Sequence, residues 1–173
     1  MKVMRLLVLW LACASLFAQQ TFTNPLLPSG PDPWVTFRNG FYYYMNSTGR
    51  NLTIWKTRSI ADLGRSEKKV IWTPPAEGPY SRDIWAPELH YLDGKWYVYF
   101  AADSGTNQTH RMWVIENPSP DPLEGSWTLK GKVADPTDKW AIDGSVFENG
   151  RSESRPVDGV FTTWPCVTMP RMP

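Results

Sequence analysis

A two-residue turn signal recurs along this chain at a nearly constant spacing. Asn39-Gly40, Asp93-Gly94 and Asn149-Gly150 are each flanked by apolar or aromatic residues, and Gly40, Gly94 and Gly150 lie 54 and 56 residues apart. Asn-Gly and Asp-Gly connect antiparallel strands well because both turn positions need positive φ. A period of this length with several strands per repeat is typical of a β-propeller, in which each repeat forms one blade.

The segments between the turns predict strands and almost no helix. Short alternating or aromatic-rich runs, such as 51–56 and 111–116, are separated by Gly, Pro, Asn or Asp. We therefore predict an all-β fold with one blade over about 30–80, a second over about 83–138 and a third that opens near residue 140. The chain would hold about two and a half blades.

The two ends of the chain depart from this repeat. Residues 1–18 combine basic residues, a short apolar run and small residues, which is the pattern of a cleaved secretory signal with the cut after Ala18 or, as second choice, Ala14. We expect secretion, a propeller domain over 19–150 and no membrane span. Residues 151–173 are rich in proline and follow no strand pattern, so we expect an off-pattern tail from another reading frame or a retained intron.

Composition limits the partners. The formal net charge of +1, with scattered charges, excludes the basic stripe that nucleic acid requires. Ten Trp and seven Tyr suit either stacking on sugars or filling the space between sheets. His90 and His110 stand apart from other ligands in sequence, so we expect no metal and no cofactor. Sequons predict possible N-glycans, at Asn46, Asn51 and Asn107.

One carboxylate stands near the start of the first strand in each repeat. Asp32, Glu88 and Asp143 precede the turn residues by 7, 5 and 6 positions. Inner strands of a propeller line its central channel, so these groups are expected to converge on one mouth of the channel. Taken singly, each has an ordinary explanation, as a turn residue or as half of an ion pair. Together they suggest glycoside hydrolysis, which needs an acid and a base on either side of the scissile bond.

Three motifs carry a specific resemblance. The sequence resembles glycoside hydrolase family 43, the five-bladed propeller arabinanases, arabinofuranosidases and xylosidases, over about residues 22–150. The motifs are Gly30-Pro31-Asp32-Pro33, the run Arg82-Asp83-Ile84-Trp85-Ala86-Pro87-Glu88, and Ala141-Ile142-Asp143-Gly144-Ser145-Val146-Phe147.

The resemblance implies an inverting mechanism on arabinan, arabinoxylan or xylo-oligosaccharides. It implies Asp32 as the general base and Asp143 as the residue that orients the acid and tunes its pKa, with Trp85, Glu88 and Trp34 against the sugar. The general acid of the family, a Glu on a later blade, has no counterpart in this chain. We therefore expect a glycosidase that is inactive or weak in this form.

Two other functions stay open from the sequence. A non-catalytic sugar-binding propeller would keep the aromatic and carboxylate contacts without the acid. A propeller used for protein interaction would not require a carboxylate near the start of each inner strand, so the positions of Asp32, Glu88 and Asp143 argue against it.

Overall fold

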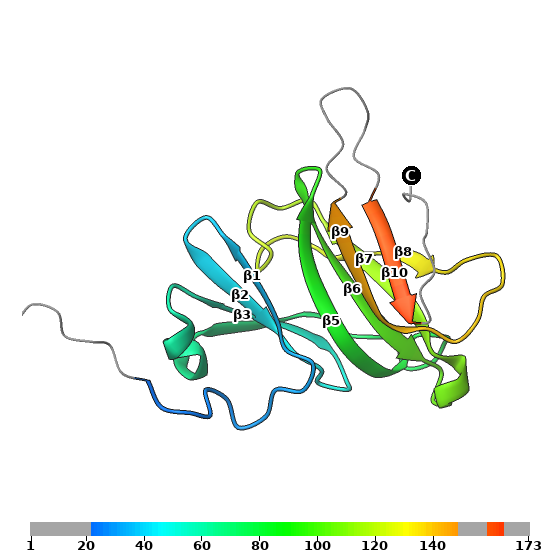
Figure 1. Ribbon diagram of the computed structural model, residues 1–173, viewed down its shortest axis with the longest axis horizontal. Coiled ribbons are helices and arrows are strands. Elements are labelled where there is room, and N and C mark those ends of the chain that lie inside the picture. The colour runs from blue at the N-terminus through cyan, green and yellow to red at the C-terminus, as the bar shows by residue number, and fades with distance from the viewer. Residues whose placement is uncertain (1–21, 149–158, 165–173) are drawn as a thin grey trace, which may run out of the picture.

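The computed structural model describes residues 22–148 and 159–164, which form two four-stranded antiparallel sheets and a two-stranded third sheet (Figure 1). The strand orders are β1-β2-β3-β4, β5-β6-β7-β8 and β9-β10. The elements are β1 (Trp34–Arg38), β2 (Phe41–Met45), β3 (Leu52–Thr57), η2 (Ile60–Arg65), β4 (Glu67–Trp72), β5 (Arg82–Leu92), β6 (Lys95–Asp103), η3 (Asn107–Thr109), β7 (Arg111–Asn117), β8 (Thr128–Val133), β9 (Ile142–Glu148) and β10 (Gly159–Trp164).

The first two predicted hairpins are confirmed. Asn39 and Gly40 join β1 to β2 with φ of 52° and 77°, and Asp93 and Gly94 join β5 to β6 with φ of 49° and 81°. Both positions of each turn thus lie in the left-handed region that Asn, Asp and Gly tolerate best. The local twist of this turn type matches the twist of the strands that it connects.

The third predicted hairpin is wrong as a two-residue connection. The partner of β9 is β10, and Gly159 stands opposite Glu148, so residues 149–158 separate the paired strands. The Asn149-Gly150 turn itself lies outside the described residues, as do the secretory signal and the positions 165–173. The off-pattern tail nevertheless contributes strand β10 to the third sheet, while its origin stays a prediction.

The second sheet is covered on both faces, as a blade inside a propeller is. Trp96, Val98 and Phe100 alternate along β6 and are fully buried against the first sheet, where the Tyr43 ring lies 5.2 Å from that of Trp96. On the opposite face of the sheet, Ala101 belongs to a second apolar cluster that reaches the third sheet. The period-two alternation of a strand explains how one sequence supplies both cores.

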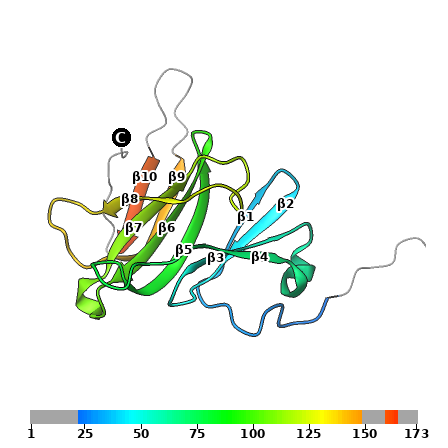
Figure 2. The same cartoon turned by 180° about the vertical axis from the view of Figure 1, so that it is seen from behind.

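The first strand of each sheet lies beside the first strand of the next, because β1 packs against β5 and β5 against β9 (Figures 1 and 2). Hydrogen bonds fix the first of these contacts. The indole N–H of Trp34 and the hydroxyl of Thr36 both donate to the carbonyl of Leu89, at 2.9 and 2.6 Å. The all-β propeller blades expected from the sequence are therefore confirmed.

Candidate active site

Asp32 and Asp143 occupy the same unusual backbone position in the first and third sheets. Their φ angles are 51° and 55°; Asp32 lies two residues before β1 begins, and Asp143 is the second residue of β9. Non-glycine residues with positive φ are uncommon and gather at functional sites. Both side chains are exposed, so the strained backbone presents a carboxylate to solvent at this end of β1 and of β9.

The second sheet differs, because its equivalent position holds Ala86 and not Glu88. Ala86 precedes its turn residue Asp93 by the same seven positions as Asp32 precedes Asn39, and its φ is 42°. Glu88 therefore stands where Trp34 stands in the first sheet. The three acidic residues expected at one repeat position thus occupy two positions, separated by two residues along the strand.

The three carboxylates nevertheless share one electrostatic environment. Although Asp143 is exposed by surface area, nearby protein atoms partly desolvate its carboxyl group and raise its pKa above the ordinary value, and the negative charges of Asp32 and Glu88 raise it further. Like charges have this effect only when they lie close together, since solvent screens distant ones. The structure therefore brings together the acidic residues that the sequence selected.

Glu88 is paired with a histidine. Its Oε2 lies 3.1 Å from Nε2 of His90, and both side chains are largely buried. The His90 ring in turn lies 4.9 Å from that of Trp34, centroid to centroid. Residues i and i+2 of a strand share a face, which places Glu88 and His90 together.

Asp32 is held by a serine. The hydroxyl of Ser47 donates to Oδ2 of Asp32 at 2.5 Å and accepts the backbone N–H of Ala86 at 2.6 Å. Ser47 follows β2 in the first sheet, whereas Ala86 belongs to β5 in the second. One side chain thus joins the carboxylate of one blade to the backbone of the next.

Trp85 presents its indole beside these groups from an irregular strand. Register shifts on both sides of Trp85 mark bulges in β5, and bulges re-aim side chains near active sites. The ring stacks on His110, with centroids 4.1 Å apart and an angle of 27° between the planes. The indole is partly exposed, so one face is supported by His110 while part of the ring remains open to a ligand.

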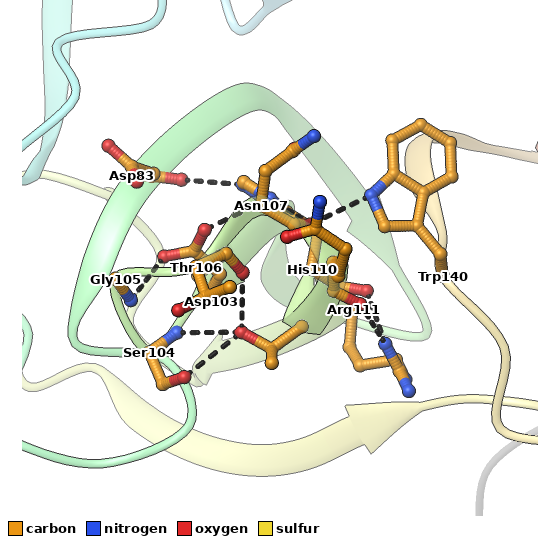
Figure 3. A network of polar contacts seen from close by, with 12 residues as sticks. Asp83, Asp103, Ser104, Gly105, Thr106, Asn107, His110, Arg111 and Trp140 are labelled. Carbon is orange, nitrogen blue, oxygen red and sulfur yellow. Dashed lines mark hydrogen bonds and ion pairs between the residues drawn. The ribbon is translucent and has the colours of Figure 1, made fainter.

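His110 belongs to a buried polar network (Figure 3). Its Nδ1 lies 3.2 Å from Oδ2 of Asp103 and 3.2 Å from the carbonyl of Asn107, and its Nε2 lies 3.3 Å from the carbonyl of Asp83. His110 and Asp103 are fully buried. The indole N–H of Trp140 donates to the same Asn107 carbonyl at 2.9 Å. This bond connects the segment just before β9 to the network.

Trp34 has a role between blades that the sequence motif did not reveal. Its N–H donates to the Leu89 carbonyl and to the Thr36 hydroxyl, and its ring contacts that of His90. These contacts serve inter-blade packing. Contact of Trp34 with a sugar stays a prediction.

Sequence reasoning missed Ser47 and misjudged both histidines as isolated. The i, i+2 spacing of Glu88 and His90 was a usable signal. No sequence signal joined Ser47 to Asp32 or His110 to Asp103, because these pairs meet only through packing between strands. Within residues 22–148 and 159–164, no cluster of three His, Cys, Asp or Glu side chains could hold a metal ion.

The predicted glycan at Asn46 is contradicted by its position. Asn46 is only 6% exposed, and its amide nitrogen donates to the carbonyl of Ser47. A glycan on this nitrogen would not fit. Asn51 is half-buried and accepts hydrogen bonds from Thr48 and Thr53, whereas Asn107 is exposed and stays a predicted acceptor.

Successive four-stranded blades with carboxylates at the ends of neighbouring inner strands define a β-propeller protein of the glycosidase class. Residues 22–154 match the model of Glycosyl hydrolases family 43. The chain belongs to this family. None of the helices in the described parts of the chain is long and apolar enough to cross a membrane.

Relatives and solved structures agree with this membership. The chain is 39% identical over 131 residues to an extracellular exo-alpha-(1->5)-L-arabinofuranosidase of Streptomyces avermitilis, covering 73% of this chain and 27% of that protein. It is 31% identical to alpha-L-arabinofuranosidase 43 of Humicola insolens, covering 78% and 29%. The crystal structure of an alpha-L-arabinofuranosidase from Lactobacillus brevis matches with a TM-score of 0.69 and 30% identity, covering 82% of this chain and 51% of that one. The chain thus spans about half or less of the proteins that it matches.

Proposed function

We propose that this protein hydrolyses O-glycosyl bonds of arabinose-containing plant polysaccharides by an inverting mechanism. The observation that carries the proposal is the shared environment of Asp32, Glu88 and Asp143, in which the first two raise the pKa of the third. Sets of carboxyl groups whose pKa values are pushed apart are the mark of acid and base assignments in glycosidases.

In this proposal Asp32 is the general base. It is exposed, and among the described residues only Ser47 hydrogen-bonds to its carboxylate, through one of the two oxygens. The other oxygen is available to accept a proton from the attacking water. Asp143 orients the general acid and keeps it protonated through its negative charge, because a nearby anion raises the pKa of a carboxylic acid. The acid itself would come from sequence beyond the matched segment.

Arabinan and its oligosaccharides are the substrates that we expect first. The names of the relatives support this choice, since they are arabinofuranosidases and, in Aspergillus fumigatus, a probable arabinan endo-1,5-alpha-L-arabinosidase. The partly open ring of Trp85 suits stacking on the C–H face of a pentose. Xylose-containing substrates and secretion of this protein are further expectations, the latter supported by the extracellular relatives.

The test uses para-nitrophenyl α-L-arabinofuranoside, because nitrophenolate departs without protonation and so needs no general acid. We expect slow turnover with inversion at the anomeric carbon, observed by proton NMR. Asp32→Asn should lower kcat by a factor of about 10² or more, as loss of a general base does. Asp62→Asn, which removes an exposed carboxylate paired with Arg65 in η2, is the matched control and should leave turnover unchanged.

A second candidate function is sugar binding without catalysis, which needs the aromatic and carboxylate contacts but no general acid. Titration with arabino-oligosaccharides, followed by tryptophan fluorescence, measures binding independently of turnover. Saturable binding with no release of nitrophenolate supports this second function. Retention of anomeric configuration, or full activity of Asp32→Asn, contradicts the inverting mechanism proposed here.

A further inference from the structure

Ser47 lies where the first and second blades meet. Its hydroxyl oxygen is 2.5 Å from Oδ2 of Asp32 and 2.6 Å from the backbone nitrogen of Ala86, and its own N–H donates to the carbonyl of Pro31 at 3.0 Å. Serine therefore contacts the residue before Asp32, the carboxylate of Asp32 and the backbone of β5. No other described side chain bonds to the Asp32 carboxylate.

The number of protons that each group carries decides which atom donates and which accepts in these hydrogen bonds. A backbone N–H can only donate, so the Ser47 oxygen accepts from Ala86. A serine hydroxyl has one proton, and the remaining neighbour of that oxygen is the Asp32 carboxylate, which accepts. The hydroxyl proton is thus directed at Oδ2 of Asp32. This leaves Oδ1 as the oxygen that can face a water molecule.

The segment around Ser47 also fixes where β5 lies. Two residues further on, Gly49 and Ile84 exchange backbone hydrogen bonds of 3.2 and 3.3 Å. The backbones at both ends of the serine bridge are strained, since φ is 51° at Asp32 and 42° at Ala86. Such positive φ angles are unfavourable for non-glycine residues and persist only when the surroundings hold them.

We infer that Ser47 is a positioning residue, which aims the Asp32 carboxylate and fixes its distance from Trp85 and Glu88 on the neighbouring blade. This inference rests on the proposed function, in which Asp32 is the base. The hydroxyl does not touch the substrate and acts through Asp32. The hydrogen bond from Ala86 to Ser47 also depends on the spacing between the two blades, because a shift of β5 would break it.

The test follows individual carboxyl groups and amides by NMR in the isotope-labelled chain, without any sugar. In the wild type, the Ala86 amide signal should follow the titration of Asp32, because ionisation of the carboxylate polarises the hydroxyl that Ala86 donates to. Glu88 and Asp143 also face Asp32, so their carboxyl signals are assigned and followed separately.

Ser47→Ala should move the Ala86 amide signal and the Asp32 carboxyl signal and should uncouple the first from the second, since the hydroxyl that joins the two groups is lost. Ser47→Thr keeps the hydroxyl and should restore both signals. Ser66→Ala is the matched control, because its hydroxyl donates to the Leu63 carbonyl elsewhere in the same blade. In turnover of the aryl arabinofuranoside, Ser47→Ala should lower kcat about tenfold with little change in KM, as misplacement of a catalytic group does.

An Ala86 amide that ignores the Asp32 titration in the wild type would overturn the inference, even if Ser47→Ala does not fold. An Ala86 amide that still follows the Asp32 carboxyl signal in a folded Ser47→Ala variant would do the same. The proposed function fails separately. If Ala86 follows Asp32 but Asp32→Asn does not slow turnover, the serine bridge stands and Asp32 is not the base.

Discussion

Replacing His110 with Ala should destabilise the protein by about 3–5 kcal/mol, because it strands a buried carboxylate. His110 and Asp103 are both fully buried. Nδ1 of His110 lies 3.2 Å from Oδ2 of Asp103, an oxygen that has no hydrogen-bond partner among the described residues, so the two groups interact through charge. Removing one member of a buried pair leaves an uncompensated charge, which accounts for a cost of about that size. The carbonyls of Asn107 and Asp83 lose the ring at the same time.

The assay is urea unfolding followed by tryptophan fluorescence. A loss of about 4 kcal/mol lowers the urea midpoint by about 2 M when the slope is about 2 kcal/mol/M. The matched control is Asp62→Asn, which breaks an ion pair at the surface. The side chains of Asp62 and Arg65 are 52% and 83% exposed. Such a surface pair contributes about 0–1 kcal/mol to the free energy of unfolding, so the urea midpoint of the Asp62→Asn variant should hardly move.

A double variant separates the stranded charge from the lost packing. If the charge dominates, His110→Ala combined with Asp103→Ala should cost less than the sum of the two single changes. A His110→Ala variant that loses under about 1 kcal/mol, or a double variant whose cost is simply additive, would refute the account of His110 and Asp103 as a coupled buried pair.

Three further predictions follow from the same structure. Asp143→Asn should abolish turnover yet stabilise the fold by a few tenths of a kcal/mol at pH 7, measured by urea unfolding. A carboxyl with a raised pKa favours the folded state in its protonated form, so wild-type stability falls as pH rises from 3.8 through the raised pKa, and the variant should lack this decline. Trp96→Ala, at the fully buried centre of the core, should cost about 3–5 kcal/mol, against under about 0.5 kcal/mol for Phe37→Ala, which is 60% exposed. Trp85→Ala should weaken arabino-oligosaccharide binding at least tenfold, and equal affinity of the variant would show that the indole only packs.

The sequence alone was enough to predict the blades, whereas the roles of the acidic residues stay predictions. Turn chemistry at Asn39-Gly40 and Asp93-Gly94 and strand alternation are local properties, and the structure confirms both hairpins. The family motifs selected Asp32 and Asp143, which share one backbone conformation. The third hairpin failed as a two-residue connection because the strand that pairs with β9 begins only at Gly159.

Tertiary structure decided how those residues are held. Ser47 meets Asp32 across 15 positions and Ala86 across 39, and His110 reaches the Asp83 carbonyl across 27. Local propensity carries no information on such distances, since they depend on how one sheet packs on the next. The bulges on either side of Trp85 in β5 likewise appear only in its pairing with β6. Period and turn chemistry therefore sufficed for the blades, whereas the contacts that aim the carboxylates exist only once the blades have packed together.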